Sequence, residues 1–542
     1  MKLDFNERAD SIPAWLNDFK IDTTSLWSYP DKQKLTIKIA KQFDIENNHV
    51  FISNGGDEAI ELLFKNCQLN NQSVLLPLPA FSQYTQQLNV WNIDYLTLEA
   101  RADYSIDVQA IKENLQPQQW LILTRPNNPT GECLDSQELV EILNQSQKVG
   151  AYVFLDEAYI EFFEGFENRL YAKEYNNVLS LRTFSKAFGL AGARVGYLLG
   201  SSNLIEQFKS IAMPFNVNRL SLQLADQALD NINEVNRYCA KIDINRSQCY
   251  RFLKQSNVEV FNGKGNFLLL RLKPQLKQLV SNYLSKQNIQ IKNQMQGLDD
   301  CIRITIPEKI EKLMLALYRI FKPEILGFDM DGVLINTSES YDVCIQKTVE
   351  SMTKYKPSKK EINQLRQKGG FNNDWDLAYS LINKYSKNIQ FNTVKNCFQD
   401  FYLGVKGMPG LIDKEVLLLD KSVWNEWSTR KVIITGRPRT EALNGVEKLN
   451  INADKIISAD DVSEQKPSPQ GILKIQKNYQ STNMWYIGDT VDDMQAGNQS
   501  NCVCIGIGNT ENSKNLYQAG ADLVLENINQ ISQLNTTERE TI

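Results

Sequence analysis

Short apolar runs alternate with segments of helical periodicity along most of this chain, and that alternation limits the folds open to it. Runs rich in Val, Ile and Leu occupy residues 73–77, 120–124, 152–156 and 178–181, and each has the length and composition of a buried strand. Strands that are apolar along their whole length are typical of parallel sheets, because helices cover both faces of such a sheet. The pattern therefore predicts an α/β fold with a largely parallel sheet.

The length of 542 residues predicts at least two domains, since single hydrophobic cores stop growing well below that size. A predicted helix over 308–320 precedes Pro323, and a new apolar strand begins at Ile325. We therefore expect a boundary near Pro323, with a first domain over residues 1–322 and a second over residues 325–530.

Composition excludes several classes of function. The chain has 59 Lys and Arg against 64 Asp and Glu, so its net charge of −5 provides no basic field for nucleic acid or for an anionic membrane surface. No apolar stretch approaches the roughly 20 residues that span a bilayer, and the polar first residues contain no apolar signal region. We expect a soluble cytoplasmic protein that binds neither nucleic acid nor membrane.

The histidine and cysteine contents narrow the chemistry. His49 is the only histidine of the sequence, so a Ser-His-Asp triad or a His-rich metal site would depend on that residue alone. The nine cysteines are scattered without a Cys-x-x-Cys pair, which argues against a disulfide framework and a structural zinc site. Catalysis is therefore expected to use Lys, Asp and bound cofactors.

One lysine lies among residues that suit bound pyridoxal phosphate. The amine of Lys186 can form a Schiff base with the cofactor aldehyde. Thr183, Ser185 and Arg194 supply two hydroxyls and a guanidinium that can hold its phosphate. Because a lysine beside small residues is more often a solvated side chain, the interpretation depends on further segments.

Two segments upstream add a phosphate site and a ring contact. Gly56 and Asp57 stand at the start of a predicted helix, where backbone N–H groups and the helix dipole favour a phosphate. Phe81 can stack on the pyridine ring. Each segment alone also fits a glycine turn or a core aromatic residue, so their value lies in combination.

The next polar residues follow the ends of predicted strands. Asn128 can donate to the phenolic oxygen of the cofactor, and Tyr159 can support the same oxygen. Asp156 can pair with the pyridine nitrogen and keep it protonated, which makes the ring an electron sink. Since the carboxyl ends of parallel strands share one edge of the sheet, a ligand site is expected there.

In this order the segments resemble the fold-type I aminotransferases of class I/II, over about residues 1–322. Within that family the chain is similar to histidinol-phosphate aminotransferase, through Asn6-Glu7, Tyr29-Pro-Asp31, Phe215-Asn-Val-Asn218 and Ile302-Arg-Ile-Thr305. The resemblance implies pyridoxal 5′-phosphate as cofactor, glutamate as amino donor and small-molecule substrates. It also implies a homodimer in which Tyr29 reaches the cofactor phosphate of the neighbouring subunit, and it assigns the substrate's acidic group to Arg303.

Two departures from the family pattern concern the far end of the substrate. Arg8 to Asp10 follow Asn6-Glu7 where the family has proline and an aromatic residue, and Lys292 stands where the family has arginine. Lysine cannot grip a phosphate in a bidentate fork. Transamination is therefore a firmer expectation than histidinol phosphate as substrate, and a threonine-phosphate decarboxylase, which uses the same cofactor residues, stays open.

The second half of the chain contains four polar segments that follow predicted strands or precede a helix. In chain order they are Asp329-Met-Asp-Gly332, Val432 to Gly436, Lys466 to Pro469 and Ile487 to Met494. These are, in order, the four motifs of the haloacid dehalogenase superfamily, which residues 325–530 resemble. The resemblance implies a Rossmann-like domain after the pyridoxal-phosphate-dependent transferase fold of the first half.

The family correspondence implies phosphoryl transfer. A carboxylate attacks phosphorus, and Mg²⁺ offsets the negative charge of the two groups that must meet. Asp329 corresponds to the nucleophile and Asp331 to the general acid and base, while Thr435 and Lys466 would hold the phosphoryl group. A magnesium-dependent phosphatase is favoured over a dehalogenase, which needs no magnesium. The expected metal residues are the carboxylates Asp329, Asp331, Asp489 and Asp493.

About ninety residues separate the first two motifs of this half, and they are rich in helical patterns. Residues 336–430 are therefore expected to form a helical cap over the site, and Lys368 to Trp375 fit either a substrate loop or a solvated turn of the cap. A second half that serves as a regulatory or structural module is the alternative. Retention of Asp329 argues against it, because loss of the nucleophile would be its expected signature.

Overall fold

The computed structural model describes residues 1–8, 10–23, 26–163, 165, 169–366, 374–386, 388–405 and 408–536. The chain forms two compact units. The first contains Met1–Leu272 and Asn288–Leu313, and the second contains Lys273–Gln287 and Met314–Ile542. The segment Lys273–Gln287, which holds helix α10 (Pro274–Lys286), is thus grouped with the second unit.

A seven-stranded sheet forms the centre of the first unit, and its strand order is β2-β8-β7-β6-β5-β3-β4. Strand β8 runs antiparallel to both of its neighbours, whereas the other pairs are parallel. The largely parallel α/β sheet expected from the sequence is therefore present. The strands are β2 (Val50–Ser53), β3 (Val74–Pro77), β4 (Tyr95–Leu98), β5 (Trp120–Thr124), β6 (Tyr152–Asp156), β7 (Val178–Thr183) and β8 (Gly196–Gly200).

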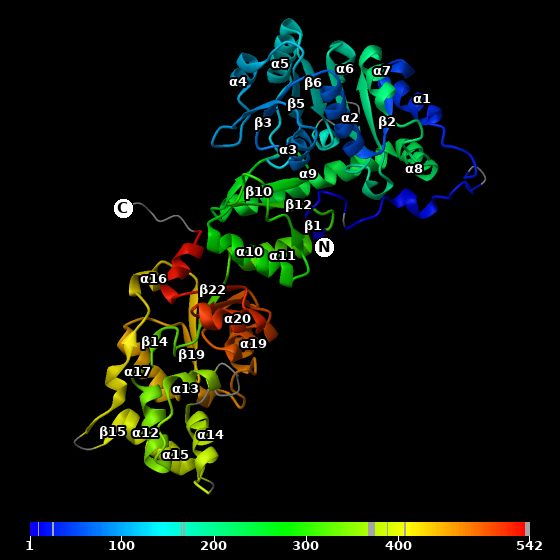
Figure 1. The fold of residues 1–542 in the computed structure, drawn as a ribbon. Coiled ribbons are helices and arrows are strands. Elements are labelled where there is room, and N and C mark those ends of the chain that lie inside the picture. The colour runs from blue at the N-terminus through cyan, green and yellow to red at the C-terminus, as the bar shows by residue number, and fades with distance from the viewer. Residues whose placement is uncertain are drawn as a thin grey trace. The chain divides into compact units, whose positions relative to one another are not determined.

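Helices connect these strands and surround the sheet (Figure 1). Helix α5 shows how the sequence sets its ends. Asp135 and Glu138 form a capping box at its start, and Gly150 ends it in the left-handed conformation, φ 77°. The helices are α1 (Gln33–Gln42), α2 (Gly55–Leu69), α3 (Ser82–Val90), α4 (Val108–Asn114), α5 (Ser136–Val149), α6 (Tyr171–Glu174), α7 (Ser202–Ile211), α8 (Arg219–Asp230) and α9 (Ile232–Gln255).

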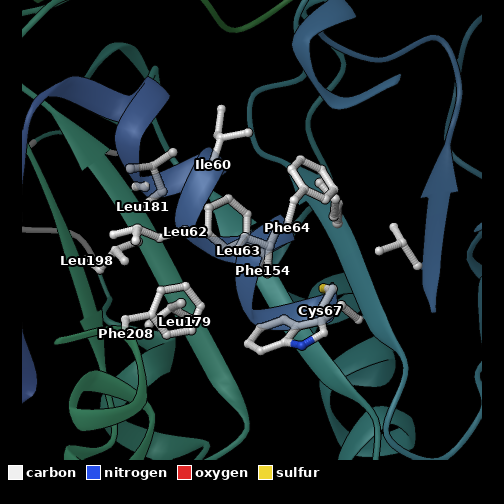
Figure 2. Packing of buried hydrophobic residues seen from close by; sticks show 14 of the residues in the cluster. Ile60, Leu62, Leu63, Phe64, Cys67, Phe154, Leu179, Leu181, Leu198 and Phe208 are labelled. Atoms are coloured by element: carbon white, nitrogen blue, oxygen red, sulfur yellow. The ribbon is translucent and has the colours of Figure 1, made fainter. Parts of the chain in front are cut away.

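The core of the first unit lies between this sheet and α2, and Figure 2 shows its side chains. Leu63 and Phe64 of α2 are fully buried against sheet residues such as Phe154 and Leu179. Burial of each such side chain contributes about 1.5–3 kcal/mol. This packing fixes the N-terminus of α2 above the carboxyl ends of the strands.

Smaller strands complete the first unit, and helix α11 begins in it and continues into the second unit after Leu313. Antiparallel strands pair in the order β12-β10-β9, and β1 pairs with β11 in parallel. The helix expected over 308–320 is present as α11, displaced by a few residues. The bounds are β1 (Lys2–Leu3), β9 (Glu259–Phe261), β10 (Phe267–Arg271), β11 (Gln290–Ile291), β12 (Cys301–Thr305) and α11 (Glu311–Phe321).

The second unit is built on a six-stranded sheet with the order β19-β18-β13-β20-β21-β22, in which all pairs are parallel. Its elements are β13 (Ile325–Phe328), β18 (Arg430–Ile434), α17 (Arg439–Leu449), β19 (Lys455–Ile457), α18 (Gln470–Tyr479), β20 (Met484–Gly488), α19 (Val491–Gln499), β21 (Val503–Ile507), α20 (Thr510–Gln518) and β22 (Leu523–Leu525).

A helical insertion separates β13 from β18. Helices α12 to α15 of this insertion have a hydrophobic core of their own, which includes Leu377, Leu381 and Phe398, and they group together in Figure 1. Most of the expected substrate loop, 368–373, lies outside the described residues. The insertion contains β14 (Ile335–Asn336), α12 (Tyr341–Thr353), α13 (Lys359–Arg366), α14 (Asp374–Tyr385), α15 (Phe391–Leu403), β15 (Gly404–Val405), β16 (Met408–Pro409), β17 (Val416–Leu417) and α16 (Lys421–Asn425).

Two exclusions made from the sequence can be compared with the structure. All nine cysteines are free thiols, and seven of them are buried. Within the described ranges, no helix combines the length and the apolar character needed to cross a membrane.

Candidate active sites

A cavity of about 680 Å³ opens at the carboxyl ends of β5, β6 and β7 in the first unit. It collects nearly all of the residues that the sequence assigns to the cofactor and its substrate. Tyr29 is the exception: its ring is 75% exposed and stacks on Phe215 with ring centroids 4.2 Å apart. The expected residues that line the cavity are Gly56, Asp57, Phe81, Asn128, Asp156, Tyr159, Thr183, Ser185, Lys186, Arg194 and Arg303.

Lys186 reaches into this cavity from the loop after β7. Its Nζ donates a hydrogen bond of 2.9 Å to the carbonyl oxygen of Phe5 and lies 5.5 Å from the centroid of the Tyr159 ring. The same amine lines the cavity, so a ligand bound there can meet it.

Donors for an anion gather at one end of the cavity. Arg194 pairs with Asp57 at 2.6 Å (Nη2 to Oδ2), and this contact orients the guanidinium at the N-terminus of α2. Thr183 donates to Ser185 with an oxygen–oxygen distance of 2.9 Å. A guanidinium, two hydroxyls and a helix N-terminus match the chemistry of a phosphate group.

Asp156 at the end of β6 is the buried carboxylate of the cavity. It accepts hydrogen bonds from the Tyr84 hydroxyl at 2.6 Å and from the backbone N–H of Ala158 at 3.0 Å. Burial raises the pKa of Asp156, whereas the bond from Tyr84 lowers it. The buried carboxylate fits a cationic ring nitrogen, which would offset the cost of its charge. Tyr84 as its partner was missed from the sequence, although a buried tyrosine hydroxyl needs a partner.

Two other partners of the expected residues come from distant segments. Arg303 donates through Nη1 to Oδ1 of Asn128 and through Nη2 to the carbonyl of Asp4, the latter at 2.7 Å. The fully buried Asn6 donates through Nδ2 to the Tyr159 hydroxyl at 3.1 Å. These contacts fix the orientation of Asn128 and Tyr159.

The two residues that depart from the family pattern, Arg8 and Lys292, differ in whether they line the cavity. Arg8 is not among the cavity residues; it donates to Ser11 at 2.9 Å and to Glu308 at 3.3 Å, and it covers the ring of Tyr238. Lys292 does line the cavity. Of the two cations, only Lys292 is therefore positioned to meet a substrate.

The second site lies at the carboxyl edge of the sheet in the second unit. Phe328 of β13 pairs with Ile433 of β18 and with Ile487 of β20, so the residues that follow these strands share one edge. Ligand oxygens of three carboxylates lie within 4.8 Å of one another there, those of Asp329, Asp489 and Asp493.

Lys466 joins two members of this carboxylate cluster. Its Nζ donates to Asp329 at 2.7 Å and to Asp493 at 2.6 Å. Burial alone would lower the pKa of Lys466, but these two carboxylates hold it well above its usual value. Asp493 also accepts from the Tyr486 hydroxyl at 3.0 Å and caps α19 through Thr490. The lysine and the acids therefore form one buried network.

Asp489 is the member of the carboxylate cluster that carries an unsatisfied acceptor. Its Oδ1 is buried and has no hydrogen-bond partner within the described part of the chain. Burial, followed by the charges of Asp493 and Asp329, raises the pKa of Asp489 well above its usual value. Three carboxylates that face one another, one with an open oxygen, fit a hard cation such as Mg²⁺.

Asp331 departs from the expected metal set. Its carboxylate points to Arg437, whose Nε and Nη2 donate to Oδ1 at 2.8 and 2.6 Å, and it is not part of the carboxylate cluster. Thr435 follows β18 as expected and accepts a hydrogen bond from the N–H of Arg437 at 3.2 Å. Arg437 itself was missed, because nothing in its sequence context distinguishes it from a surface arginine.

The folds and sites define two enzyme classes on one chain: a pyridoxal-phosphate-dependent transferase and a haloacid dehalogenase-like hydrolase. Residues 2–317 match the family model for aminotransferase class I and II, and the chain belongs to that family. Residues 326–507 match the model for haloacid dehalogenase-like hydrolase.

Individual relatives agree with the first assignment. The histidinol-phosphate aminotransferase of Yersinia pestis is 29% identical over 347 residues, which cover 60% of this chain and 89% of that protein. The crystal structure of histidinol-phosphate aminotransferase from Clostridium acetobutylicum has a TM-score of 0.53 at 22% identity and covers 58% of this chain and 97% of its own. L-threonine-O-3-phosphate decarboxylase from Porphyromonas gingivalis has a TM-score of 0.51, with the same identity and coverage. These two structures support the fold and do not separate the two activities.

Proposed function

We propose that the first unit transfers an amino group with bound pyridoxal phosphate and that the second unit hydrolyses a phosphate monoester with bound Mg²⁺. The first proposal is carried by the convergence of Lys186, Asp156, Asn128 and Arg194 on one cavity. The second is carried by the carboxylate cluster with Lys466 at its centre.

In the aminotransferase site, pyridoxal phosphate when bound supplies an aldehyde and an electron-withdrawing ring. Lys186 provides the amine that holds the cofactor and then moves a proton at the substrate's Cα. Asp156 stabilises a protonated ring nitrogen, and Tyr159, held by Asn6, supplies a hydroxyl to the phenolic oxygen. Arg194, Thr183 and Ser185 hold the phosphate.

Lys186→Ala tests this assignment. The variant should lose transamination and the visible absorbance of the lysine-bound cofactor, and phosphate ester hydrolysis should be unchanged. Lys292→Ala, which removes another lysine of the same cavity, should keep that absorbance. Normal transamination by Lys186→Ala would refute the role of Lys186.

The substrate pair is proposed to be histidinol phosphate and the corresponding ketone, imidazole-acetol phosphate, with glutamate as amino donor. The similarity to histidinol-phosphate aminotransferases over most of their length supports this proposal. Arg303 and Lys292 are the cations of the cavity that can meet the substrate's acidic group. Release of CO₂ from threonine phosphate without transamination would favour the decarboxylase instead.

In the phosphatase site, Mg²⁺ when bound offsets negative charge between the nucleophile and the phosphate. Asp489, Asp493 and Asp329 are the residues that would hold it. The carboxylate of Asp329 attacks phosphorus, the P–O bond to the leaving group breaks, and Asp331 protonates the leaving oxygen. Asp331 then takes a proton from the water that hydrolyses the phosphorylated Asp329, while Thr435 and Lys466 hold the phosphoryl oxygens.

Asp329→Asn keeps the volume of the side chain and removes the attacking charge. Phosphatase turnover should fall by several orders of magnitude, and the control variant Asp413→Asn, at an exposed position of the insertion, should retain it. Near-normal hydrolysis by Asp329→Asn, or none by the wild type on any ester with Mg²⁺, would refute the proposal and favour a regulatory role.

The two activities are proposed to act in sequence, because the amino product of the first carries the phosphate that the second removes. Fusion raises the effective concentration of the second site. With imidazole-acetol phosphate, glutamate and Mg²⁺, histidinol and free phosphate should form together. Accumulation of histidinol phosphate without phosphate release would leave two unrelated activities.

We also propose a cytoplasmic homodimer. Tyr29, 75% exposed, stacks on the exposed Phe215, and Trp27, two residues before Tyr29, is 88% exposed, so this part of the chain offers apolar surface to a second copy. A single species of twice the chain mass in light scattering is the expected result. A stable monomer with bound cofactor would refute the assembly and the role of Tyr29 in it.

A further inference from the structure

Arg437 is the most buried cation of the phosphatase site, and it lies between the carboxylate of Asp331 and the helical insertion. Its side chain is 1% exposed, whereas that of Asp331 is 29% exposed. Both Nε and Nη2 donate to the same oxygen, Oδ1 of Asp331. Two donors on one oxygen set the rotation of the carboxylate and do not use its second oxygen.

The other side of the guanidinium faces residues of the insertion. Nη2 donates to Oε1 of Glu415 at 2.9 Å, and the side chain of Glu415 is itself 1% exposed. Tyr402 of α15 donates to the same Glu415 oxygen at 2.9 Å. The ring of Tyr341 on α12 lies 5.2 Å from the guanidinium carbon. Arg437 is therefore bound to the insertion as well as to Asp331.

This arrangement is costly unless every partner is in place. A buried guanidinium needs opposite charges and satisfied donors, and removal of one partner of a buried ion pair leaves an uncompensated charge. Movement of α15, which carries Tyr402, or of the segment that carries Glu415 would therefore also displace Arg437, and with it the carboxylate of Asp331.

We propose that Arg437 is a positioning residue that orients Asp331, and that this orientation depends on the position of the helical insertion, which contacts Arg437 through Glu415 and Tyr402. The inference rests on the phosphatase function proposed above. Transfer of a proton from Asp331 to the leaving oxygen requires the second oxygen of that carboxylate to point at the scissile bond. Arg437 holds the first oxygen, so it governs this step without contacting the substrate.

Leaving groups separate positioning of a general acid from a structural role. An alkoxide leaves poorly and needs the proton of Asp331, whereas p-nitrophenolate leaves well without it. Arg437→Gln should lower kcat/KM for an alkyl phosphate at least about 100-fold and lower kcat/KM for p-nitrophenyl phosphate less than about tenfold, by analogy with the 10²–10⁴-fold contribution of general acids. The comparison uses kcat/KM because this constant covers the steps up to release of the leaving group and not the later hydrolysis of phosphorylated Asp329, in which Asp331 acts as a base on either ester. Asp331→Asn should show the same selectivity and a larger loss.

Arg439→Gln is the matched control. Arg439 lies two residues along the chain and contacts the Ile456 carbonyl and Asp461 instead of Asp331. Its kcat/KM for both esters should match that of the wild type. Tyr402→Phe keeps Arg437 and removes the hydroxyl that fixes Glu415, and it should show a milder loss confined to the alkyl ester.

Equal losses of kcat/KM on both esters, or no loss on either, in a folded Arg437→Gln protein would overturn the inference and leave the phosphatase proposal standing. If Arg437→Gln does not fold, Tyr402→Phe decides, and equal effects on both esters would overturn the inference. Absence of any Mg²⁺-dependent hydrolysis by the wild type would overturn the phosphatase proposal and this inference with it.

Discussion

Gly332 lacks a side chain at a point where the carboxylate of Asp489, a proposed Mg²⁺ ligand, lies against the backbone. It follows Met330 and Asp331 in the loop after β13 and has φ +74°, in the left-handed region that favours glycine. A Cβ at this position would lie 2.0 Å from Oδ2 of Asp489 and 2.5 Å from its Cγ. Gly332→Ala should therefore displace the carboxylate that is proposed to bind Mg²⁺.

The size of the effect follows from the geometry. An ordinary contact begins at 3.4 Å, so the oxygen must move about 1.4 Å, the difference between 3.4 and 2.0 Å. Since Mg²⁺ holds its ligands at about 2.0–2.1 Å in near-ideal octahedral geometry, such a displacement removes the ligand. Loss of orientation alone costs about 10–100-fold in metal affinity, and we expect at least that loss. The left-handed backbone adds about 1–2 kcal/mol of destabilisation.

The assay is calorimetric titration with Mg²⁺ of the full-length protein, loaded with pyridoxal phosphate and freed of Mg²⁺, together with ester hydrolysis over a series of Mg²⁺ concentrations. Gly150→Ala is the control, because Gly150 has φ +77° and no atom lies within 4 Å of its built Cβ. That variant should lose stability and keep the Mg²⁺ affinity of the wild type. A folded Gly332→Ala protein with wild-type Mg²⁺ affinity would show that Asp489 is not a metal ligand.

Three further predictions concern buried groups of the first unit. Burial raises the pKa of Glu161 to about 7, so ionisation of this carboxyl destabilises the fold increasingly as the pH rises from 4.5 to 7, by up to about 3 kcal/mol. In thermal unfolding, the stability of Glu161→Gln relative to the wild type should therefore be higher at pH 8 than at pH 4.5 by about that amount. A stability difference between variant and wild type that does not change with pH would contradict this. Glu157 and Arg182 form an ion pair of 2.9 Å with side chains 1% and 0% exposed, so Glu157→Gln should cost about 3–5 kcal/mol of unfolding free energy, and a loss below about 1 kcal/mol would count against it. Tyr84→Phe removes a donor to Asp156, so cofactor affinity and transamination should fall together; unchanged titration with pyridoxal phosphate would reject that link.

Much of both sites could be predicted from the sequence because their polar residues stand directly at the ends of strands that the sequence pattern identifies. Apolar runs of strand length identify β5, β6, β7 and β13, and parallel strands bring their carboxyl ends to one edge. Asp156 and Asp329 stand directly at such ends, so their presence in a site follows from local pattern alone. Their roles in catalysis stay predictions until the variants are measured.

The partners of these residues could not be predicted in the same way. Arg303 meets Asn128 across 175 positions of sequence, and Asn6 meets Tyr159 across 153. Asp331 was expected beside the metal and instead accepts from Arg437, 106 positions away. Which donor satisfies a buried acceptor depends on rotamers and on the packing of distant segments, and neither leaves a periodic signal in the chain.

The sequence by itself thus determined the two α/β sheets, the order of the motifs and the chemical groups at each strand end, because these depend on local hydrophobic pattern and on strand direction. Only the tertiary structure decided which of those groups face one another. It turned Arg8 away from the cavity and Asp331 away from the carboxylate cluster, and it left Tyr29 exposed. The physical reason is that a buried charge or hydroxyl takes the partner that the whole fold brings within hydrogen-bond distance.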